Sequence, residues 1–487
     1  MQFFPILFAF FGLVHATALA STAGLEYLNM LREQAGLSPL RSHNALQQSA
    51  QAHSHYLNLH QITGHLEEES LEGFTGLHAS DRAVAAGFES LAVSENVSRG
   101  QSDIYSSIDK LFGGIYHRFT FLDMRKDLIG IGVEARNYTF DLGNSYLDLL
   151  CRDHEYLGGP YYYNACSDRE KRIESTLYDQ AQNYYKNTSE APEMVVWPPK
   201  NGTDILPGFY GENPDPLPEY AVSGYPVSVE FNDQSHPEAP DDLHIEMSSN
   251  DGQTLAGILI DSTNDPEERF TPYQFAFFPL EHLEWGTRYR VAMEFDGERR
   301  EWCFSTRSLS SYGAQKVYRI DSNSPEKLEV VSGRTYALYF VPRDPKDQFE
   351  RYHYRYNTQN PSISFIDRNT LLFTVSGETG QRVELTLDNP TDQNITLMIS
   401  TSDQAEPPRE DLCPQISSTP ATIEENSYTT STEYSTENLD SDQNESDVLQ
   451  EHTATVSKAA GGSFSSILFL WSIGLIYILR RERLLRS

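Results

Sequence analysis

Apolar residues recur every three or four positions at two places near the start of the chain, over residues 25–35 and 46–57. This spacing puts the apolar side chains on one face of a helix, so two amphipathic helices are predicted. Gly36 and Pro39 lie between the two stripes and separate the helices. His53 falls on the second apolar stripe, so we expect it to pack in the core.

Two further helices and a strand follow. Ser80 is a suitable N-cap for a short helix, and an apolar stripe over residues 104–115 predicts a helix that ends just before His117. Residues 129–133 alternate a β-branched residue with glycine, which predicts a strand. Its glycine face has no side chains, so another backbone can lie close against it. Helices combined with such a strand indicate an α+β or a three-layer sandwich domain over residues 21–166.

The apolar period changes to two residues farther along the chain. Residues 167–194 are predicted to be a helical or linker connection. Residues 195–307 contain alternating runs and the hairpin signals Asp251-Gly252 and Asp296-Gly297, which predict an immunoglobulin-like β-sandwich. Residues 308–402 repeat this kind of pattern, so a second β-rich, sandwich-like domain is predicted.

Three tyrosines stand two residues apart in the second β-rich segment. Tyr352, Tyr354 and Tyr356 therefore share one face of a strand. Packing across strands is the expected role of such a row, and a carbohydrate-facing aromatic platform is the alternative.

Both ends of the chain carry apolar segments. Residues 3–14 are almost wholly apolar and Ala18-Leu19-Ala20 fits a signal-peptidase site, so residues 1–20 are predicted to be a signal peptide. Residues 464–479 form a second apolar run, followed by four arginines. As a helix this run is about 24 Å long, which suffices to cross a bilayer if the arginines snorkel. We therefore expect a short C-terminal transmembrane helix with its arginines in the cytoplasm.

Composition limits the classes of partner. The chain has 487 residues, enough for about three domains. Its 37 Lys and Arg against 70 Asp and Glu give a net charge of −33, which would repel a phosphate backbone, so no nucleic-acid partner is expected. Four cysteines are too few for a disulfide-dense scaffold, although an exported chain can form one or two bridges.

The C-terminal segment resembles a known sorting signal. Gly461-Gly462-Ser463, the short apolar run and the arginine-rich end are similar to the GlyGly-CTERM tail of Gram-negative bacteria, here over residues 461–487. The resemblance implies cleavage near the glycines by a rhomboid-like sorting protease and display at the cell surface; a permanent membrane anchor is the alternative. Residues 403–460 are acidic, rich in Ser and Thr and poor in large apolar residues, which predicts a disordered tether.

The first domain resembles the CAP superfamily, also called SCP, in its bacterial form. The matching pieces stand in the family's order: Tyr27–Arg32 with Gly36–Leu40, Ala52–Ser54, His65, Asp81–Ala83 with Ala86–Phe88, Glu95–Val97, His117-Arg118 and Ile129–Val133. The resemblance implies an α-β-α sandwich with a cleft in which two histidines and acidic residues meet. Carried over to this chain, the cleft residues are His65, His117 and Glu95. Arg82 and Arg118, from the same pieces, are expected to form salt bridges.

His65, His117 and Glu95 suggest one chemistry. Two neutral imidazoles and a carboxylate that converge on a cleft could hold a divalent ion such as Zn²⁺, with Glu95 as a ligand or as a base acting on bound water. Larger CAP proteins have a second glutamate upstream of the last histidine, whereas this chain has Leu111–Gly114 there. A weak metal site or none is therefore expected, and histidines that hydrogen-bond loops together are the alternative.

Other catalytic patterns are missing from the sequence. It contains no Gly-x-Ser-x-Gly elbow, Walker loop, Rossmann glycine fingerprint or His-Glu-x-x-His helix. Cys151 and Cys166 flank the tyrosines at 161–163 and are predicted to form a disulfide that closes this loop. A bridge between Cys303 and Cys413 is left open.

These observations favour a binding protein. We expect an exported, membrane-associated or surface-displayed protein whose CAP head binds an extracellular or envelope ligand, while the β-rich domains hold the head away from the membrane. The first alternative is a weakly metal-dependent hydrolase or peptidase that uses His65, His117 and Glu95. The second is an adhesive or structural surface protein. Because no complete catalytic constellation is present in the sequence, binding is favoured over turnover.

Overall fold

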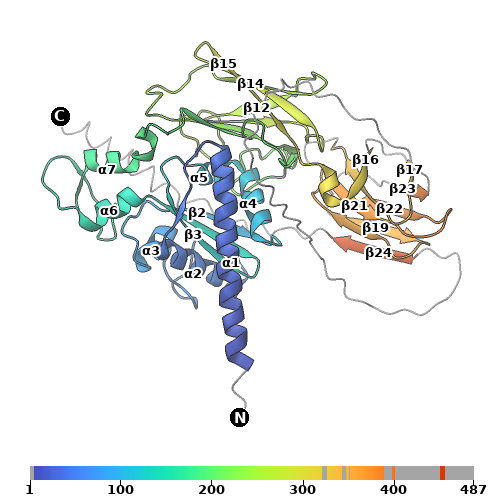
Figure 1. The fold of residues 1–487 in the computed structure, drawn as a ribbon, viewed down its shortest axis with the longest axis horizontal. Helices are drawn as coiled ribbons and strands as arrows, with labels where there is room; N and C mark the ends of the chain where they lie inside the picture. The colour runs from blue at the N-terminus through green and yellow to red at the C-terminus, as the bar shows by residue number, and fades with distance from the viewer. Residues whose placement is uncertain are drawn as a thin grey trace, which may run out of the picture.

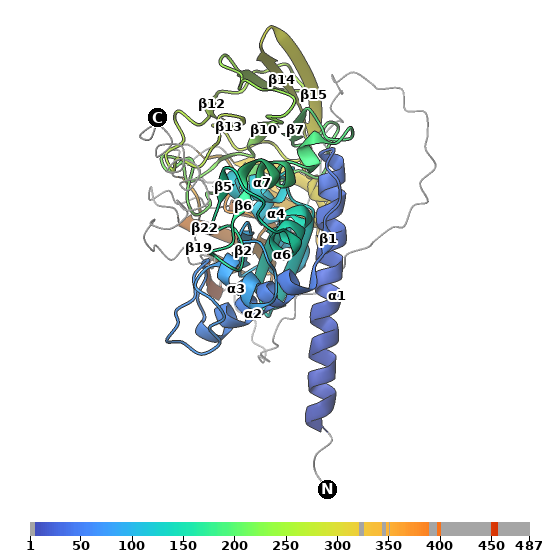
Figure 2. The ribbon, with the colours of Figure 1, turned by 90° about the vertical axis from the view of Figure 1, so that its left-hand side faces the viewer.

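The computed structural model describes residues 5–320, 326–342, 347–349, 351–388, 397–400 and 450–455. Figure 1 shows a mixed head of helices and strands followed by two β-rich units. In both views the N-terminal half of the first helix extends beyond the head (Figures 1 and 2).

The head surrounds a four-stranded sheet of order β1-β3-β4-β2, in which β1 runs parallel to β3 and the other pairs are antiparallel. Its elements are α1 (Pro5–Gln34), β1 (Arg41–Ser42), α2 (Asn44–His60), α3 (Ala79–Ala85), β2 (Ser94–Arg99), α4 (Ile104–Gly113), α5 (Ile115–Phe121), β3 (Leu128–Glu134), β4 (Asn137–Gly143), α6 (Ser145–Asp153), β5 (Tyr161–Tyr162), β6 (Ile173–Glu174), α7 (Ser175–Gln182) and the 3-10 helix η1 (Tyr185–Asn187). A mixed α/β head was expected, and the structure agrees.

Helix α2 lies directly on the glycine face of β3. A Cβ at Gly130 would come within 2.0 Å of the Leu46 carbonyl carbon, and one at Gly132 within 2.0 Å of the Ala50 oxygen. Gln47 reinforces this approach by exchanging two hydrogen bonds with the backbone of the same strand, of 2.6 and 3.1 Å. The expected close backbone contact is confirmed, and only glycine fits at these two positions.

Two helix boundaries differ from those expected. The helix predicted over 104–115 breaks at Gly114, whose extended ψ of 139° ends α4, and α5 begins at once. His117 therefore lies inside a helix rather than after one. The N-cap of α3 is His78 instead of Ser80, and the Asp81 carboxylate accepts the His78 backbone N–H at 3.1 Å.

The first β unit contains two sheets, of order β12-β13-β10-β7 and β11-β14-β15, and a small β8-β9 pair. Its strands are β7 (Met194–Trp197), β8 (Gly208–Phe209), β9 (Ser223–Gly224), β10 (Val227–Phe231), β11 (His244–Ser249), β12 (Gly257–Ile260), β13 (Gln274–Pro279), β14 (Arg288–Phe295) and β15 (Glu298–Ser305). Side chains of both large sheets meet in one core, as in a β-sandwich. Its immunoglobulin-like class stays a prediction. We call residues 198–226, between β7 and β10, the connecting segment.

The second β unit also has two sheets, of order β16-β18-β21-β20 and β17-β23-β22-β19-β24. Its elements are the 3-10 helix η2 (Leu309–Tyr312), β16 (Ala314–Ile320), β17 (Glu326–Glu329), β18 (Thr335–Phe340), β19 (Arg351–Tyr356), β20 (Ser362–Phe365), β21 (Thr370–Thr374), β22 (Val383–Asp388), β23 (Leu397–Ser400) and β24 (Gln450–Thr455). Tyr352 and Tyr356 are buried and Tyr354 packs against the same core, so this row of tyrosines packs across strands.

Strand β24 corrects one boundary of the predicted tether. Residues 450–455 were expected inside the disordered stretch 403–460, yet they pair with β19 in antiparallel register. Pairing satisfies the backbone groups along one side of β19, which favours a strand despite the polar composition. The rest of that stretch, the tail at 461–487 and Cys413 lie outside the described residues. Among the residues that the structure describes, no helix is long and apolar enough to span a bilayer.

The head and the first β unit share one hydrophobic core. A single cluster of buried side chains includes Leu28, Ile108 and Phe140 from the head and Val229, Phe231 and Phe304 from the β unit. The head and the first β unit are therefore joined through this common core, and not by a hinge between two separate cores.

Arg118, in α5 of the head, makes hydrogen bonds to the connecting segment and the first β unit. It was expected to form a salt bridge, but its guanidinium donates to the Pro226 carbonyl at 2.7 Å and to the Ser228 hydroxyl at 3.1 Å, and it lies 4.7 Å from the centre of the Tyr225 ring. The Tyr225 hydroxyl in turn donates to the Phe112 carbonyl of the head at 2.9 Å. Burial lowers the pKa of Arg118, although nearby Tyr225 and Glu212 oppose the shift.

We predict that Tyr225→Ala destabilises the head together with the β unit, because it removes a buried ring and two hydrogen bonds from the shared core. The expected loss is about 3–5 kcal/mol in the free energy of unfolding. Hydrogen exchange should show protection falling in peptides from both β3 and β10. Tyr163→Ala, at an exposed site, is the control and should change stability by no more than about 0.5 kcal/mol. Loss of protection in β10 alone would contradict a shared core.

Candidate functional site

Glu95 is the central residue of the head's polar network. It stands on β2, its side chain is 1 % exposed, and its two oxygens have different partners. Oε1 lies 2.9 Å from Nδ1 of His65, and Oε2 accepts a hydrogen bond of 2.5 Å from Arg82. Burial would raise the pKa of Glu95, but the charge of Arg82, helped by His53 and His65, outweighs burial and holds this pKa well below its usual value. Glu95 is therefore ionised.

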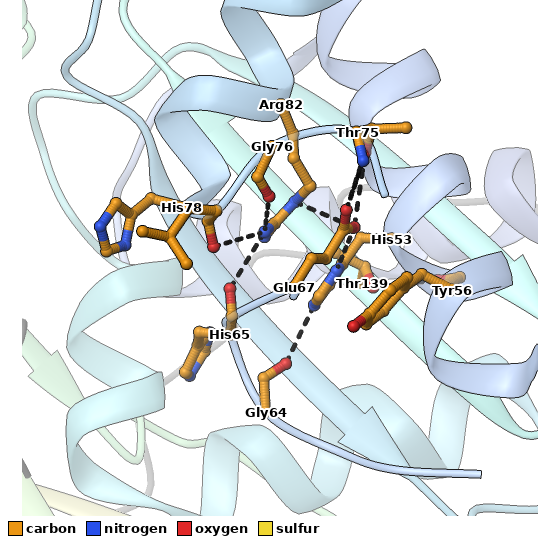
Figure 3. A network of polar contacts seen from close by, with 12 residues as sticks. His53, Tyr56, Gly64, His65, Glu67, Thr75, Gly76, His78, Arg82 and Thr139 are labelled. Carbon is orange, nitrogen blue, oxygen red and sulfur yellow. Dashed lines mark hydrogen bonds and ion pairs between the residues drawn. The ribbon is translucent and has the colours of Figure 1, made fainter. Parts of the chain in front are cut away.

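A second carboxylate, Glu67, completes the surroundings of Arg82 (Figure 3). Glu67 Oε1 lies 2.9 Å from Nδ1 of His53 and 3.8 Å from Nε of Arg82, and its Oε2 accepts the Thr75 backbone N–H at 2.6 Å. Arg82 also donates to the carbonyl of His65 at 3.0 Å. The network thus fixes the loop between α2 and α3, which carries His65, onto the sheet.

His53 is buried, as its place on an apolar stripe predicts, but both of its ring nitrogens have polar partners. Nδ1 faces Glu67, and Nε2 lies 2.9 Å from the Gly64 carbonyl. Both ring nitrogens of His53 therefore face oxygen atoms that can accept hydrogen bonds. His53 thereby anchors the backbone just before His65.

Asp141 adds a third buried carboxyl group. It stands opposite Glu95 in the β2–β4 register and is fully buried. Burial, reinforced by the negative charge of Glu95, raises its pKa well above the usual value, and Arg82 only partly opposes this. Of these two neighbouring buried carboxyl groups, Asp141 therefore has the higher pKa and Glu95 the lower, so a shared proton resides on Asp141.

His117 has a carboxylate partner that comes from outside the head. Its Nδ1 lies 2.6 Å from Oε2 of Glu212, in the connecting segment, and both side chains are largely buried. The same carboxylate accepts the backbone N–H groups of Ile115 and Tyr116, so it also caps the N-terminus of α5. A Cβ at Gly114 would come within 2.5 Å of this carboxylate, which explains the glycine at the helix break.

The three predicted cleft residues are thus only partly brought together. His65 and Glu95 are in direct contact. The ring of His117 contacts Glu212 instead. The backbone carbonyl of His117 accepts a hydrogen bond of 2.9 Å from the side chain of Asn96, the residue next to Glu95. Strand β2 therefore touches both histidine segments through two successive residues.

Protein groups already contact the predicted metal ligands. Both oxygens of Glu95 and Nδ1 of His117 are engaged by protein groups. Across the described part of the chain, no group of three or more His, Cys, Asp or Glu side chains is placed to hold a metal ion. The divalent ion at His65, His117 and Glu95 stays a prediction, and no chemical step is assigned to it.

Sequence reasoning missed Glu67, Asp141 and Glu212. The sequence does contain a signal for Asp141. An acid between two apolar residues of a strand is unexpected unless it has a partner or stays neutral. Glu67 lies in an acidic stretch and Glu212 in a proline-rich one, where a carboxylate is ordinary. Glu212 matters most of the three, because it contacts His117 and lies against Gly114, within the stretch where this chain has no glutamate of its own.

The loop disulfide is present in the structure. Cys151 and Cys166 are bonded, with their Cα atoms 5.3 Å apart, and they close the loop that carries the exposed tyrosines. A disulfide between Cys303 and Cys413 stays open, because Cys413 lies outside the described residues.

We predict that Gly114→Ala displaces Glu212 and loosens the head from the connecting segment. The added methyl group would collide with the carboxylate, which costs about 1–3 kcal/mol in unfolding free energy. Gly113→Ala is the matched control, since a Cβ there meets only the Tyr225 ring at 3.8 Å. Urea denaturation of both variants measures the difference, and equal stability would contradict the role given to Gly114.

We predict that Asp141→Asn stabilises the protein at neutral pH. The native pKa of Asp141 lies above its unfolded value of about 3.9, so the native state holds a proton that the unfolded state releases, and stability from this group falls as pH rises above about 4. Asn imitates the neutral acid and removes that loss. The variant should match the wild type near pH 3.5 and exceed it increasingly towards pH 8. A variant less stable at every pH would contradict a protonated Asp141.

Comparison with known proteins agrees with the geometry of the head. Residues 25–141 match the family model described as CAP, the cysteine-rich secretory protein family. No curated protein is similar enough to the chain to count as a match.

Three bacterial proteins are among the solved structures with a region similar to part of this chain. An extracellular protein containing an SCP domain from Bacillus anthracis is 18 % identical over 26 % of this chain and 40 % of its own, with a TM-score of 0.24. A cysteine-rich secretory protein from Staphylococcus aureus is 16 % identical over 26 % of this chain and 39 % of its own, with a TM-score of 0.18. An outer surface protein from Borrelia burgdorferi is 14 % identical over 24 % of this chain and 87 % of its own, with a TM-score of 0.21. The chain thus spans less than half of the first two proteins.

The family match ends at residue 141, within β4 and before the connecting segment, so Glu212 lies outside it. On the evidence of that match, the chain contains at residues 25–141 a domain of the CAP family.

Proposed function

We propose that the protein is exported and that its CAP head binds an extracellular or envelope ligand with apolar surface, while the β units hold the head away from the membrane. The observation that carries this proposal is where apolar side chains are exposed. Among the described residues, the large apolar residues that are exposed all belong to the head or to its first helix: Leu19, Met30, Leu59, Ile62, Leu66, Leu71, Leu77, Tyr105, Leu149, Leu157, Tyr161, Tyr163, Leu177 and Tyr184.

Five of these side chains gather in one stretch of sequence around His65. They run from the end of α2 through the loop that the network of Arg82 holds in place: Leu59, Ile62, Leu66, Leu71 and Leu77. The side chain of His65 itself is 34 % exposed. Exposed apolar groups beside a polar side chain on a fixed loop are typical of a binding surface.

The state of Glu95 favours binding over turnover. A general base needs a free oxygen pointing at its substrate, but Arg82 and His65 already occupy both oxygens of this carboxylate. The depressed pKa of Glu95 also makes it a weak base. A hydrolase that uses His65, His117 and Glu95 would have to open these contacts first.

Export is supported by the family and by the N-terminal sequence. The matching family is described as secretory, and a signal peptide is predicted over residues 1–20. Anchoring or sorting through residues 461–487 remains part of the proposal and rests on the sequence alone.

We predict that Leu66→Ser combined with Leu71→Ser weakens binding of an apolar probe by tenfold or more. Each change removes several buried methyl or methylene groups from the complex, worth about 0.8 kcal/mol apiece. Nile red fluorescence, titrated with the mature full-length chain, measures the binding. Tyr163→Ser is the matched control, because Tyr163 is exposed on the loop that the Cys151–Cys166 disulfide closes; it should leave the titration unchanged.

Two results would count against this proposal. Equal loss of Nile red binding in the double variant and the control would show that the His65 loop is not the site. Stoichiometric zinc in the purified chain, lost with a chelator and in His65→Ala plus His117→Ala, would favour the metal-dependent hydrolase instead.

A further inference from the structure

An open hollow of about 470 Å³ lies outside the segment that matches the CAP family. It is lined by six residues of the connecting segment and one of the second β unit: Tyr210, Gly211, Asp215, Pro218, Tyr220, Ala221 and Gln348. Its volume is within the range of small-molecule sites in proteins. Because both β units contribute, the hollow exists only where the two units meet.

The walls combine aromatic rings with a few polar groups. Tyr220 packs against the apolar cluster around Ile115 and Phe278, and the Tyr210 ring lies 6.0 Å from the ring of His282. Each ring is therefore held by the protein on one side while it lines the hollow. Rigid aromatic surfaces of this kind suit the apolar face of a flat ligand.

The polar groups are held in place as well. Oδ1 of Asp215 accepts the Leu217 backbone N–H at 2.9 Å, which orients the carboxylate. Gly211 has φ +79°, a left-handed conformation that brings its backbone close to that carboxylate. On the opposite wall the side-chain oxygen of Gln348 accepts a hydrogen bond from Arg368, so the amide N–H groups of Gln348 are its remaining donors.

The surrounding charges have both signs. Burial, and after it the acids Glu212 and Glu267, raise the pKa of Asp215, so this wall is lined and flanked by acidic side chains. The Gln348 wall is next to the cation Arg368. The lining therefore does not select an ion of one sign, and it offers an acceptor on one wall and donors on the other, which a neutral ligand with many hydroxyl groups can use together.

We propose that this hollow binds a neutral saccharide, with Tyr210 and Tyr220 against the apolar face of a sugar ring and with Asp215 and Gln348 on its hydroxyl groups. Asp215 accepts hydrogen bonds from the hydroxyls and Gln348 donates to them, which matches the double donor and acceptor character of a sugar. The site is separate from the His65 loop and does not depend on the function proposed for the head.

The experiment uses the mature full-length chain on an array of neutral hexose and N-acetylhexosamine oligosaccharides, followed by calorimetric titration with the strongest binder. We expect saturable binding that falls at least tenfold in Asp215→Ala and in Gln348→Ala, two substitutions of half-buried side chains. Tyr163→Ala and the Leu66→Ser plus Leu71→Ser variant are the controls and should bind the sugar as the wild type does, with unchanged circular dichroism in all four variants.

Three results would overturn the proposal. The first is no array signal together with no heat change for maltose, cellobiose, lactose or chitobiose at concentrations up to about 10 mM, where even a weak complex of about −3 to −4 kcal/mol is detected. The second is sugar binding that both Asp215→Ala and Gln348→Ala leave unchanged. The third is displacement of the sugar by choline or glucuronate at equal concentration, which would assign the hollow to a charged ligand.

Discussion

Charge compensation around the buried guanidinium of Arg82 is the interaction on which the head's polar network depends. Arg82 is almost fully buried, and Glu95 and Glu67 place carboxylates on two sides of it. An uncompensated buried charge costs several kcal/mol, so neither carboxylate can leave without a large loss of stability. Because the same guanidinium binds the carbonyl of His65, charge balance in the interior sets the shape of the exposed loop.

A second, independent constraint joins the head to the connecting segment and the first β unit. Glu212 caps α5 and contacts His117, while Arg118 and Tyr225 make hydrogen bonds across the boundary between the two parts. The histidine that family resemblance assigns to the cleft is thereby held by a residue outside the family match. Its environment belongs to this multidomain chain and could not be deduced from an isolated CAP domain.

Local patterns predicted the elements of the head well and its long-range contacts poorly. The amphipathic stripes before residue 60 and the glycine face at Gly130 and Gly132 follow from spacing alone, and the structure agrees with them. The break at Gly114 escaped prediction because its cause, Glu212, is almost a hundred residues away. The proton on Asp141 escaped for the same reason, since it depends on a neighbour across the sheet. Strand β24 needed a partner edge that composition does not reveal.

The core shared by the head and the first β unit has a mechanical consequence. The Trp285 side chain also donates to Thr370 of the second β unit at 3.1 Å, so contacts continue along the described part of the molecule. A force on the first β unit would therefore rotate the head together with it, because no flexible joint separates their cores. The direction in which the His65 loop faces is then set by the orientation of the first β unit.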